Sequence, residues 1–288
     1  MLNILVCLKQ VAYLPSRMAI GPDGKIDKDG VVYVPNPYDE LALEEALRVK
    51  EQKKQAEVIL ISVGPPRVEN VLRYGMAMGA DWSIHVCDDE LENMNYTFTS
   101  NCLMKVIKDR RFDMIFFGIK ATDTNNGIVG CRIAELLNLT YVSSVTEVRA
   151  LENKNLGMFK ILDRGNRQAL ECEPPVVLSI GRGTVKPRYP TLKERRLSLA
   201  KKIVKITPSE LGIESSLTAE TVNKIPKISL LRPTPKKIFT PDSELTAIER
   251  LKLTISGGLV EKRTNSFDGS PQETAEQFIN FIEENSII

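Results

Sequence analysis

The clearest indication of the fold is the stretch Phe112-Asp-Met-Ile-Phe-Phe-Gly-Ile-Lys-Ala-Thr-Asp-Thr-Asn-Asn-Gly-Ile-Val-Gly130. It opens with a short apolar run, 112–117, of the kind that forms a strand buried on both faces of a sheet. Glycines and small polar residues follow from Gly118, and an amphipathic pattern from Ile128 to Leu137 then predicts a helix. A strand, a loop and a helix are therefore expected in succession.

The same succession fills the chain upstream of this stretch. Apolar runs that predict strands alternate with amphipathic patterns that predict helices, at 3–8, 39–53, 57–63, 68–78, 83–87 and 94–110. Repeated strand–helix units pack as parallel strands joined by right-handed crossovers. We therefore predict an α/β fold with a doubly wound, mostly parallel sheet.

Downstream of Leu139 the pattern changes. Runs at 142–148, 157–162 and 176–180 predict strands without long helices between them, so we expect antiparallel strands at the edge of the sheet. An insertion at 12–35, with glycines and a proline at its centre, predicts a hairpin between the first strand and its helix.

We place the end of this α/β domain (1–207) before Pro208 and expect 208–288 to form an extended arm. The arm lacks the strand–helix alternation and is interrupted by prolines, and such segments commonly lie on a partner. Its end, about 271–285, is predicted to be a helix, because Ser270 and Glu273 have the spacing of a capping box. The apolar stripe of this helix consists of Ala275, Phe278, Ile279 and Ile282.

The composition is that of an ordinary globular protein. Of 288 residues, 42% are hydrophobic and 26% are charged, and the net charge of +2 is too small for a dominant nucleic-acid-binding surface. No apolar run approaches the ~18 residues that span a bilayer. The first apolar run, 3–8, is too short for the core of a signal peptide, so we expect a cytoplasmic protein.

The residues that support metal and nucleophile chemistry are few and scattered. The chain has five cysteines, none in CxxC spacing, and a single histidine, His85. These counts argue against a disulfide framework, a zinc or iron–sulfur centre, and a histidine-based triad. We expect no metal site and no catalytic residues in this chain alone.

Ligands of open parallel sheets bind at the carboxyl ends of the strands, where the strand order reverses. The loop Gly118–Gly130 follows a buried strand and opens a helix, so it could bind a phosphate, although a glycine-rich turn before a capped helix explains it equally. Cys7 and Val63 end two other strands, and Asn36 either caps the 39–53 helix or pairs with a base edge. Together these loops predict an adenine-nucleotide pocket.

Several stretches also form an ordered set of motifs. They are Val6-Cys-Leu-Lys-Gln10, Asn36-Pro-Tyr-Asp-Glu-Leu-Ala-Leu-Glu-Glu-Ala46, Gly64-Pro65 with Leu72-Arg73 and Ala77-Met-Gly-Ala-Asp81, Gly118–Gly130, and Pro187-Arg-Tyr-Pro-Thr-Leu192. This set resembles the electron transfer flavoprotein beta-subunit family, including its nitrogen-fixation-associated relatives, over about residues 3–212.

The resemblance implies a heterodimer with a larger alpha subunit and the adenine nucleotide alpha hydrolase-like version of the fold. It implies a FAD held mainly by the alpha subunit, with Tyr13 or Leu14 of this chain near the flavin ring. It also implies a second adenine nucleotide in this chain, AMP in ordinary members or a second FAD in electron-bifurcating ones. By position, its contacts would be Cys7, Asn36, Val63, Gly118, Asp123, Asn125, Asn126, Gly127, Val129 and Gly130.

The resemblance assigns partner recognition to a segment at about 183–200. Leu192 would anchor partner dehydrogenases, with Arg188 and Tyr189 beside it. The implied role is to carry electrons between flavin dehydrogenases, such as acyl-CoA dehydrogenases, and an acceptor such as a quinone oxidoreductase. The basic run Lys193–Lys205 is then expected to contact partners, although a solvated helix face explains its rear half equally.

Three alternatives stay open. The Val129-Gly130 ending is similar to electron-bifurcating members with a second FAD and NADH as donor, but their Pro-Asp-Thr is replaced here by Ala12-Tyr13-Leu14. A stand-alone adenine-nucleotide sensor of the universal-stress type shares this kind of sheet but leaves Pro187–Leu192 unexplained. A hydrolase or ligase would need a complete phosphate-loop motif, which this sequence lacks.

Overall fold

The computed structural model describes most of the chain. The described residues are 2–13, 31–53, 55–89, 91, 94–151, 155–183, 185–213, 241–255 and 267–284. The chain divides into two compact units, Met1–Leu230 and Leu231–Ile288. Among the described residues, no helix combines the length and the apolar character needed to cross a bilayer.

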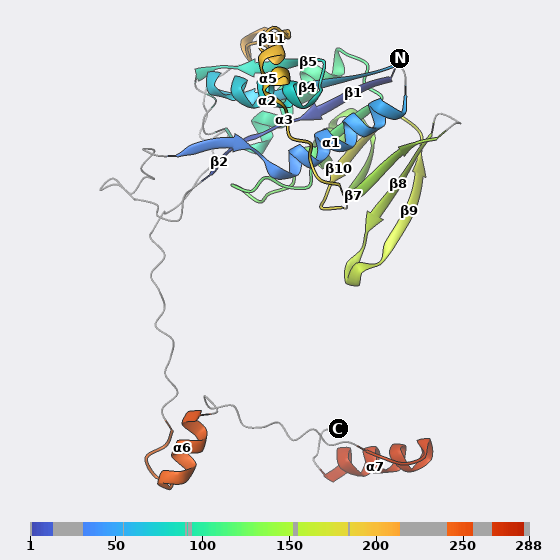
Figure 1. Ribbon diagram of the computed structural model, residues 1–288. Helices are drawn as coiled ribbons and strands as arrows, with labels where there is room; N and C mark the ends of the chain where they lie inside the picture. The colour runs from blue at the N-terminus through green and yellow to red at the C-terminus, as the bar shows by residue number, and fades with distance from the viewer. Residues whose placement is uncertain are drawn as a thin grey trace. The chain divides into compact units, whose positions relative to one another are not determined.

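A nine-stranded sheet forms the centre of the first unit (Figure 1), in the order β11-β5-β4-β1-β6-β10-β7-β8-β9. The strands are Leu2–Cys7 (β1), Ala56–Gly64 (β4), Trp82–Cys87 (β5), Met114–Gly118 (β6), Thr140–Ala150 (β7), Leu156–Ile161 (β8), Arg167–Cys172 (β9), Val176–Ile180 (β10) and Ile203–Ile206 (β11). Neighbours pair in parallel from β11 through β7, and β7–β8 and β8–β9 pair antiparallel. The predicted doubly wound, mostly parallel sheet is confirmed.

Helices cover both faces of this sheet. They are Pro37–Gln52 (α1), Glu69–Met78 (α2), Tyr96–Lys108 (α3), Val129–Leu137 (α4) and Leu192–Ser198 (α5), with short 3₁₀ turns at Pro66–Val68 (η1), Asp163–Gly165 (η3) and Ser209–Leu211 (η4). Because successive strand residues face opposite sides, Ile4 of β1 packs in one core with α1 and α2, and Leu5 packs in a second core with α3 and α4. Each large side chain buried in this way contributes about 1.5–3 kcal/mol.

The strand order reverses beside β1. The chain builds β4 and β5 outward from one side of β1 and then returns to place β6 on the other side. The loops after β1 and β6 therefore leave the carboxyl edge of the sheet in different directions. In such folds this switch point is where ligands bind.

The expectation that 176–180 is an antiparallel addition at the edge was wrong. This stretch is β10, which lies inside the sheet and runs parallel to both β6 and β7. All five of its residues are buried, as expected for a strand covered on both faces. The chain leaves β7, forms the antiparallel strands β8 and β9, and then returns to insert β10 beside β6.

The insertion after β1 forms the expected hairpin. Gln10–Tyr13 (β2) pairs antiparallel with Val32–Pro35 (β3). Leu14 and the rest of the connection, up to residue 30, lie outside the described residues.

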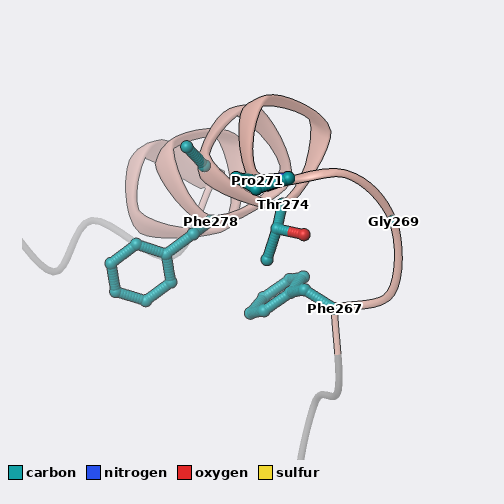
Figure 2. Close-up of a pocket in the computed structure, with 6 residues that line it drawn as sticks. Phe267, Gly269, Pro271, Thr274 and Phe278 are labelled. Atoms are coloured by element: carbon teal, nitrogen blue, oxygen red, sulfur yellow. The ribbon is translucent and has the colours of Figure 1, made fainter.

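The second unit contains two described helices, Ala247–Ile255 (α6) and Pro271–Glu284 (α7). The predicted capping box of α7 is confirmed, because the Ser270 N–H donates to Glu273 Oε2 at 2.8 Å and the Glu273 N–H donates to Ser270 Oγ at 3.4 Å. Figure 2 shows Phe267 lying beside Phe278 at the start of this helix, with ring centroids 6.0 Å apart. Most of the expected arm between these helices and residue 213 lies outside the described residues.

Candidate functional site

The loops that the sequence singled out meet at the carboxyl edge of the sheet. Cys7, Val63 and Gly118 lie at the ends of β1, β4 and β6, which are adjacent strands. The name switch-point crevice is used here for residues 7–10 after β1, Asn36 and Asp39 at the start of α1, and Gly118 at the end of β6. The loop 119–128 that follows β6, where the sequence predicts a nucleotide contact, is called the nucleotide loop. Tyr13 lies on the β2–β3 hairpin opposite Val32 and is 63% exposed.

Asn36 connects the start of α1 to the nucleotide loop. Its side chain is buried, its Nδ2 donates to the Lys120 carbonyl at 2.9 Å, and its Oδ1 accepts the Thr122 N–H at 3.2 Å. Asn36 occupies the N-cap position of α1, but its side chain makes no capping hydrogen bond there. The helix-cap interpretation of this side chain was therefore wrong, and its amide shapes the nucleotide loop instead.

Asp39, one turn further along, joins the two walls of the crevice. Its Oδ2 accepts the Lys9 N–H at 2.7 Å and its Oδ1 accepts the Gly118 N–H at 3.0 Å. Burial raises the pKa of Asp39 to about 7, against the lowering effect of these hydrogen bonds. A side chain on Gly118 would collide with Asp39 and Tyr38, so this glycine is required by the packing of the chain itself.

Lys9 and Asp123 form an ion pair across the mouth of the crevice. Lys9 Nζ lies 2.7 Å from Asp123 Oδ2, and both side chains are partly exposed. Sequence reasoning named Asp123 but missed Lys9 and Asp39 as site residues. An acid in the first turn of a helix is ordinary dipole complementation, so Asp39 carried no distinguishing signal in the sequence.

The nucleotide loop presents backbone and small polar groups to solvent. Asn125 and Gly127 have positive φ values of 55° and 63°, and a Cβ on Gly127 would meet the Ile119 carbonyl. Residues 122–128 are exposed, and no side chain caps the N-terminus of α4, which begins at Val129. An uncapped helix N-terminus behind a glycine-containing loop fits the phosphate of a nucleotide.

The thiol and the carboxyl groups described at the crevice are buried or already bonded. Cys7, the nucleophilic side chain at the end of β1, is buried, and burial raises the pKa of its thiol well above the ordinary range. A protonated thiol is a poor nucleophile. Of the two carboxyl groups at the crevice, Asp39 accepts backbone N–H groups and Asp123 pairs with Lys9.

The segment Pro187–Leu199, called here the recognition segment, is attached to α1 through Arg188. The Arg188 guanidinium donates to Glu44 from Nε and Nη2 and to Glu51 from Nη1, and its backbone N–H also donates to Glu44. Burial raises the pKa of the Glu44 carboxyl, but the contacts with Arg188 outweigh this effect, so the pKa is lowered. Arg188 therefore fixes the segment in place.

The recognition segment exposes large apolar side chains among polar and charged ones. Leu192 is 77% exposed and Tyr189 is 79% exposed. A capping box between Thr191 and Glu194 starts α5 at Leu192, and the Arg195 guanidinium donates to the Tyr189 hydroxyl at 3.1 Å. A rigid segment that holds apolar groups in solvent is suited to bind another protein.

The basic run divides into two parts. Lys201 Nζ donates to the carbonyls of Met76 and Ala80 at the end of α2, and Lys205 pairs with Glu69 at 2.9 Å. The rear half thus attaches the end of the α5 segment and β11 to α2. Lys193, Arg196 and Lys202 are exposed and remain candidates for partner contact.

Comparisons with known proteins agree with this geometry. The electron transfer flavoprotein domain family matches residues 23–211. The chain is 33% identical to the electron transfer flavoprotein subunit beta of Methylophilus methylotrophus, over 75% of this chain and 83% of that protein. It is 34% identical to the subunit of the same name from Thermoanaerobacterium thermosaccharolyticum (78% and 88% covered) and 32% identical to that of Homo sapiens (78% and 90% covered). The chain therefore belongs to the electron transfer flavoprotein beta-subunit family.

Proposed function

We propose that this chain is the beta subunit of a heterodimer with an electron transfer flavoprotein alpha subunit. The heterodimer carries electrons between flavin dehydrogenases, such as acyl-CoA dehydrogenases, and an acceptor such as a quinone oxidoreductase. The observation that carries the proposal is the switch-point crevice, in which Asn36 and Asp39 position the nucleotide loop of a chain from this family. Flavin, when bound, supplies the electron chemistry.

The crevice holds an adenine nucleotide in this proposal. The α4 N-terminus and the nucleotide loop bind its phosphate, and the ends of β1 and β4 line its base. AMP is the first candidate, because the family resemblance assigns AMP to ordinary members. A second FAD, with NADH as donor, is the alternative that the Val129-Gly130 ending of the loop favours.

The recognition segment docks the redox partners. Leu192 is its anchor, because it is the most exposed aliphatic side chain of a segment that Arg188 and the α5 capping box make rigid. Rigid apolar anchors bind with a small loss of conformational entropy. Tyr189 and the exposed cations Lys193 and Arg196 form the surroundings of this anchor.

Coexpression of the full-length chain with its alpha subunit tests the proposal. We expect a copurifying yellow complex that shows flavin absorbance and is bleached on reduction by a dehydrogenase donor. The full-length chain purified alone is the control and should be colourless. A chain that fails to associate with alpha and binds ATP by itself would support a nucleotide sensor instead.

A further inference from the structure

The strands β1 and β6 separate at the crevice. They pair directly at Ile4–Met114, Leu5–Ile115 and Val6–Phe116, and the described pairing ends there. Beyond this point the N–H groups of Lys9 and Gly118 both donate to the carboxylate of Asp39, which belongs to a third element, α1. Asp39 therefore links two backbone segments that no longer pair with each other.

Asp113 makes a comparable contact at the opposite edge of the sheet. Its carboxylate accepts the Asn3 N–H at 2.7 Å, and its own N–H donates to the Asn3 carbonyl at 2.9 Å. There the carboxylate reinforces two strands that already pair. Asp113 provides a natural matched control, since it joins the same two strands at the edge remote from the crevice.

We propose that Asp39 is a positioning residue whose carboxylate sets the spacing of the Lys9 and Gly118 backbones at the switch-point crevice and thereby retains the adenine nucleotide. This inference rests on the proposed function. Asp39 holds the backbone of Lys9, and Asp123 holds the ammonium group of the same residue at 2.7 Å. Loss of the Asp39 carboxylate would free the N–H groups of Lys9 and Gly118 together.

The fit around Asp39 leaves little room for another arrangement. The side chain is 6% exposed, and Gly118 packs against both Asp39 and Tyr38 without space for a Cβ. Two backbone donors, 79 and 30 residues distant in sequence, converge on one carboxylate. Both N–H groups thus share a single carboxyl group as their acceptor.

The charge of Asp39 changes in the physiological range, since burial raises its pKa to about 7. Protonation turns one carboxyl oxygen into a donor and a weaker acceptor, so the hydrogen bond from one of the two N–H groups weakens. The groups that face this site are the Lys9 ammonium, paired with Asp123, and the Cys7 thiol. On the Tyr38 side, the cations of Lys120 and Arg182 lie 5.9 and 5.8 Å from the ring. We expect the nucleotide to be held less tightly as the pH falls from 8 to 6.

The test compares full-length wild type, Asp39→Asn and Asp113→Asn, each purified with the alpha subunit. The release of radiolabelled AMP is measured at pH 6, 7 and 8, together with hydrogen exchange of the Lys9 and Gly118 amides. Asp39→Asn should release AMP roughly tenfold faster, as expected for losing a hydrogen bond to a charged group. Its release should lose the Asp39-dependent part of the pH profile, leaving only the titration of the phosphate. Asp113→Asn should keep the wild-type rate and profile.

A second variant, Gly118→Ala, keeps the carboxylate but forces Asp39 and Tyr38 apart, and should release AMP faster at every pH. If Asp39→Asn folds poorly, this variant and the amide exchange still decide the question. Asp39→Asn or Gly118→Ala with wild-type AMP release would overturn the inference alone. A wild-type complex that binds neither AMP nor FAD at this chain would overturn the proposed function, and the inference with it.

Discussion

The switch-point crevice and the recognition segment are built on the same helix but use their charged residues differently. At the start of α1, Asn36 and Asp39 hold the loops of the crevice. Two and four turns later, Glu44 and Glu51 hold Arg188 of the recognition segment. In the crevice the polar side chains point inward and leave backbone groups for a ligand, whereas the recognition segment turns apolar side chains outward.

Two motif residues contact their own regions of the chain rather than being left free for a ligand or partner. Arg188, which the family resemblance placed beside the docking anchor, forms ion pairs with α1 at 2.7 and 2.8 Å. Asn36, which it placed against the nucleotide, hydrogen-bonds the nucleotide loop. Both side chains act first on the shape of their own region. If the two regions are separable, a change in one should leave the function of the other intact.

The largest effect is expected from the pH dependence of stability. Because burial raises the pKa of Asp39 from 3.8 to about 7, the folded chain binds this proton more tightly than the unfolded chain. The free energy of unfolding should therefore fall as pH rises from about 4 to 7, by about 4 kcal/mol through this group. Urea unfolding of wild type and Asp39→Asn across this range isolates the effect, since the variant should lack the decline. An equal decline in the variant would assign the titration to another group.

The next largest effect is a loss of stability when Asn36 is substituted. Asn36→Ala leaves the Lys120 carbonyl and the Thr122 N–H without their partner, which should cost about 1–3 kcal/mol of stability. The purified complex should also carry less adenine nucleotide, because the nucleotide loop loses its support. The docking rate of a donor dehydrogenase should be unchanged. A matching loss of docking would show that the two regions are coupled through α1.

Leu192→Ala is the reciprocal experiment. Truncation of a docking anchor costs about 2 kcal/mol or more, so electron transfer from an acyl-CoA-type dehydrogenase should slow at least about tenfold. The nucleotide content should stay at the wild-type level. Leu199→Ala is the matched control, because Leu199 is 68% exposed at the other end of the recognition segment. Unchanged electron transfer in Leu192→Ala would remove Leu192 from docking.

The smallest effect is expected from the exposed cations. Raising the ionic strength should slow docking a few-fold through screening, and Lys193→Ala should weaken this salt dependence. Lys205→Ala, which removes a cation already paired with Glu69, should leave the salt dependence unchanged. Stopped-flow rates at low and high salt measure both. A rate insensitive to salt would show that the run is only a solvated surface.

Local sequence patterns predicted the alternating strands and helices, because buried parallel strands are short apolar runs and their helices are amphipathic. They could not place β10, whose neighbours depend on the path of the whole chain. They also missed β9 and β11. The first is largely exposed and the second alternates apolar residues with a lysine, so neither carries the continuous apolar signal of a central strand.

The candidate site shows the same limit. Loops that follow neighbouring parallel strands were expected to meet, and Cys7, Val63 and Gly118 do lie at one edge. The contact of Asp39 with Lys9 and Gly118 could not be foreseen, because it depends on how three separate segments approach one another. The role of Asp39 can be inferred only from the positions of Lys9 and Gly118 in the fold.

The central claim is that this chain holds an adenine nucleotide within a flavoprotein heterodimer. The most direct measurement is to denature the purified complex and count the released nucleotides by chromatography. We expect one FAD and one AMP for each heterodimer, or two FAD if the bifurcating alternative holds. A complex that releases only a single FAD, with no second adenine nucleotide, would contradict it.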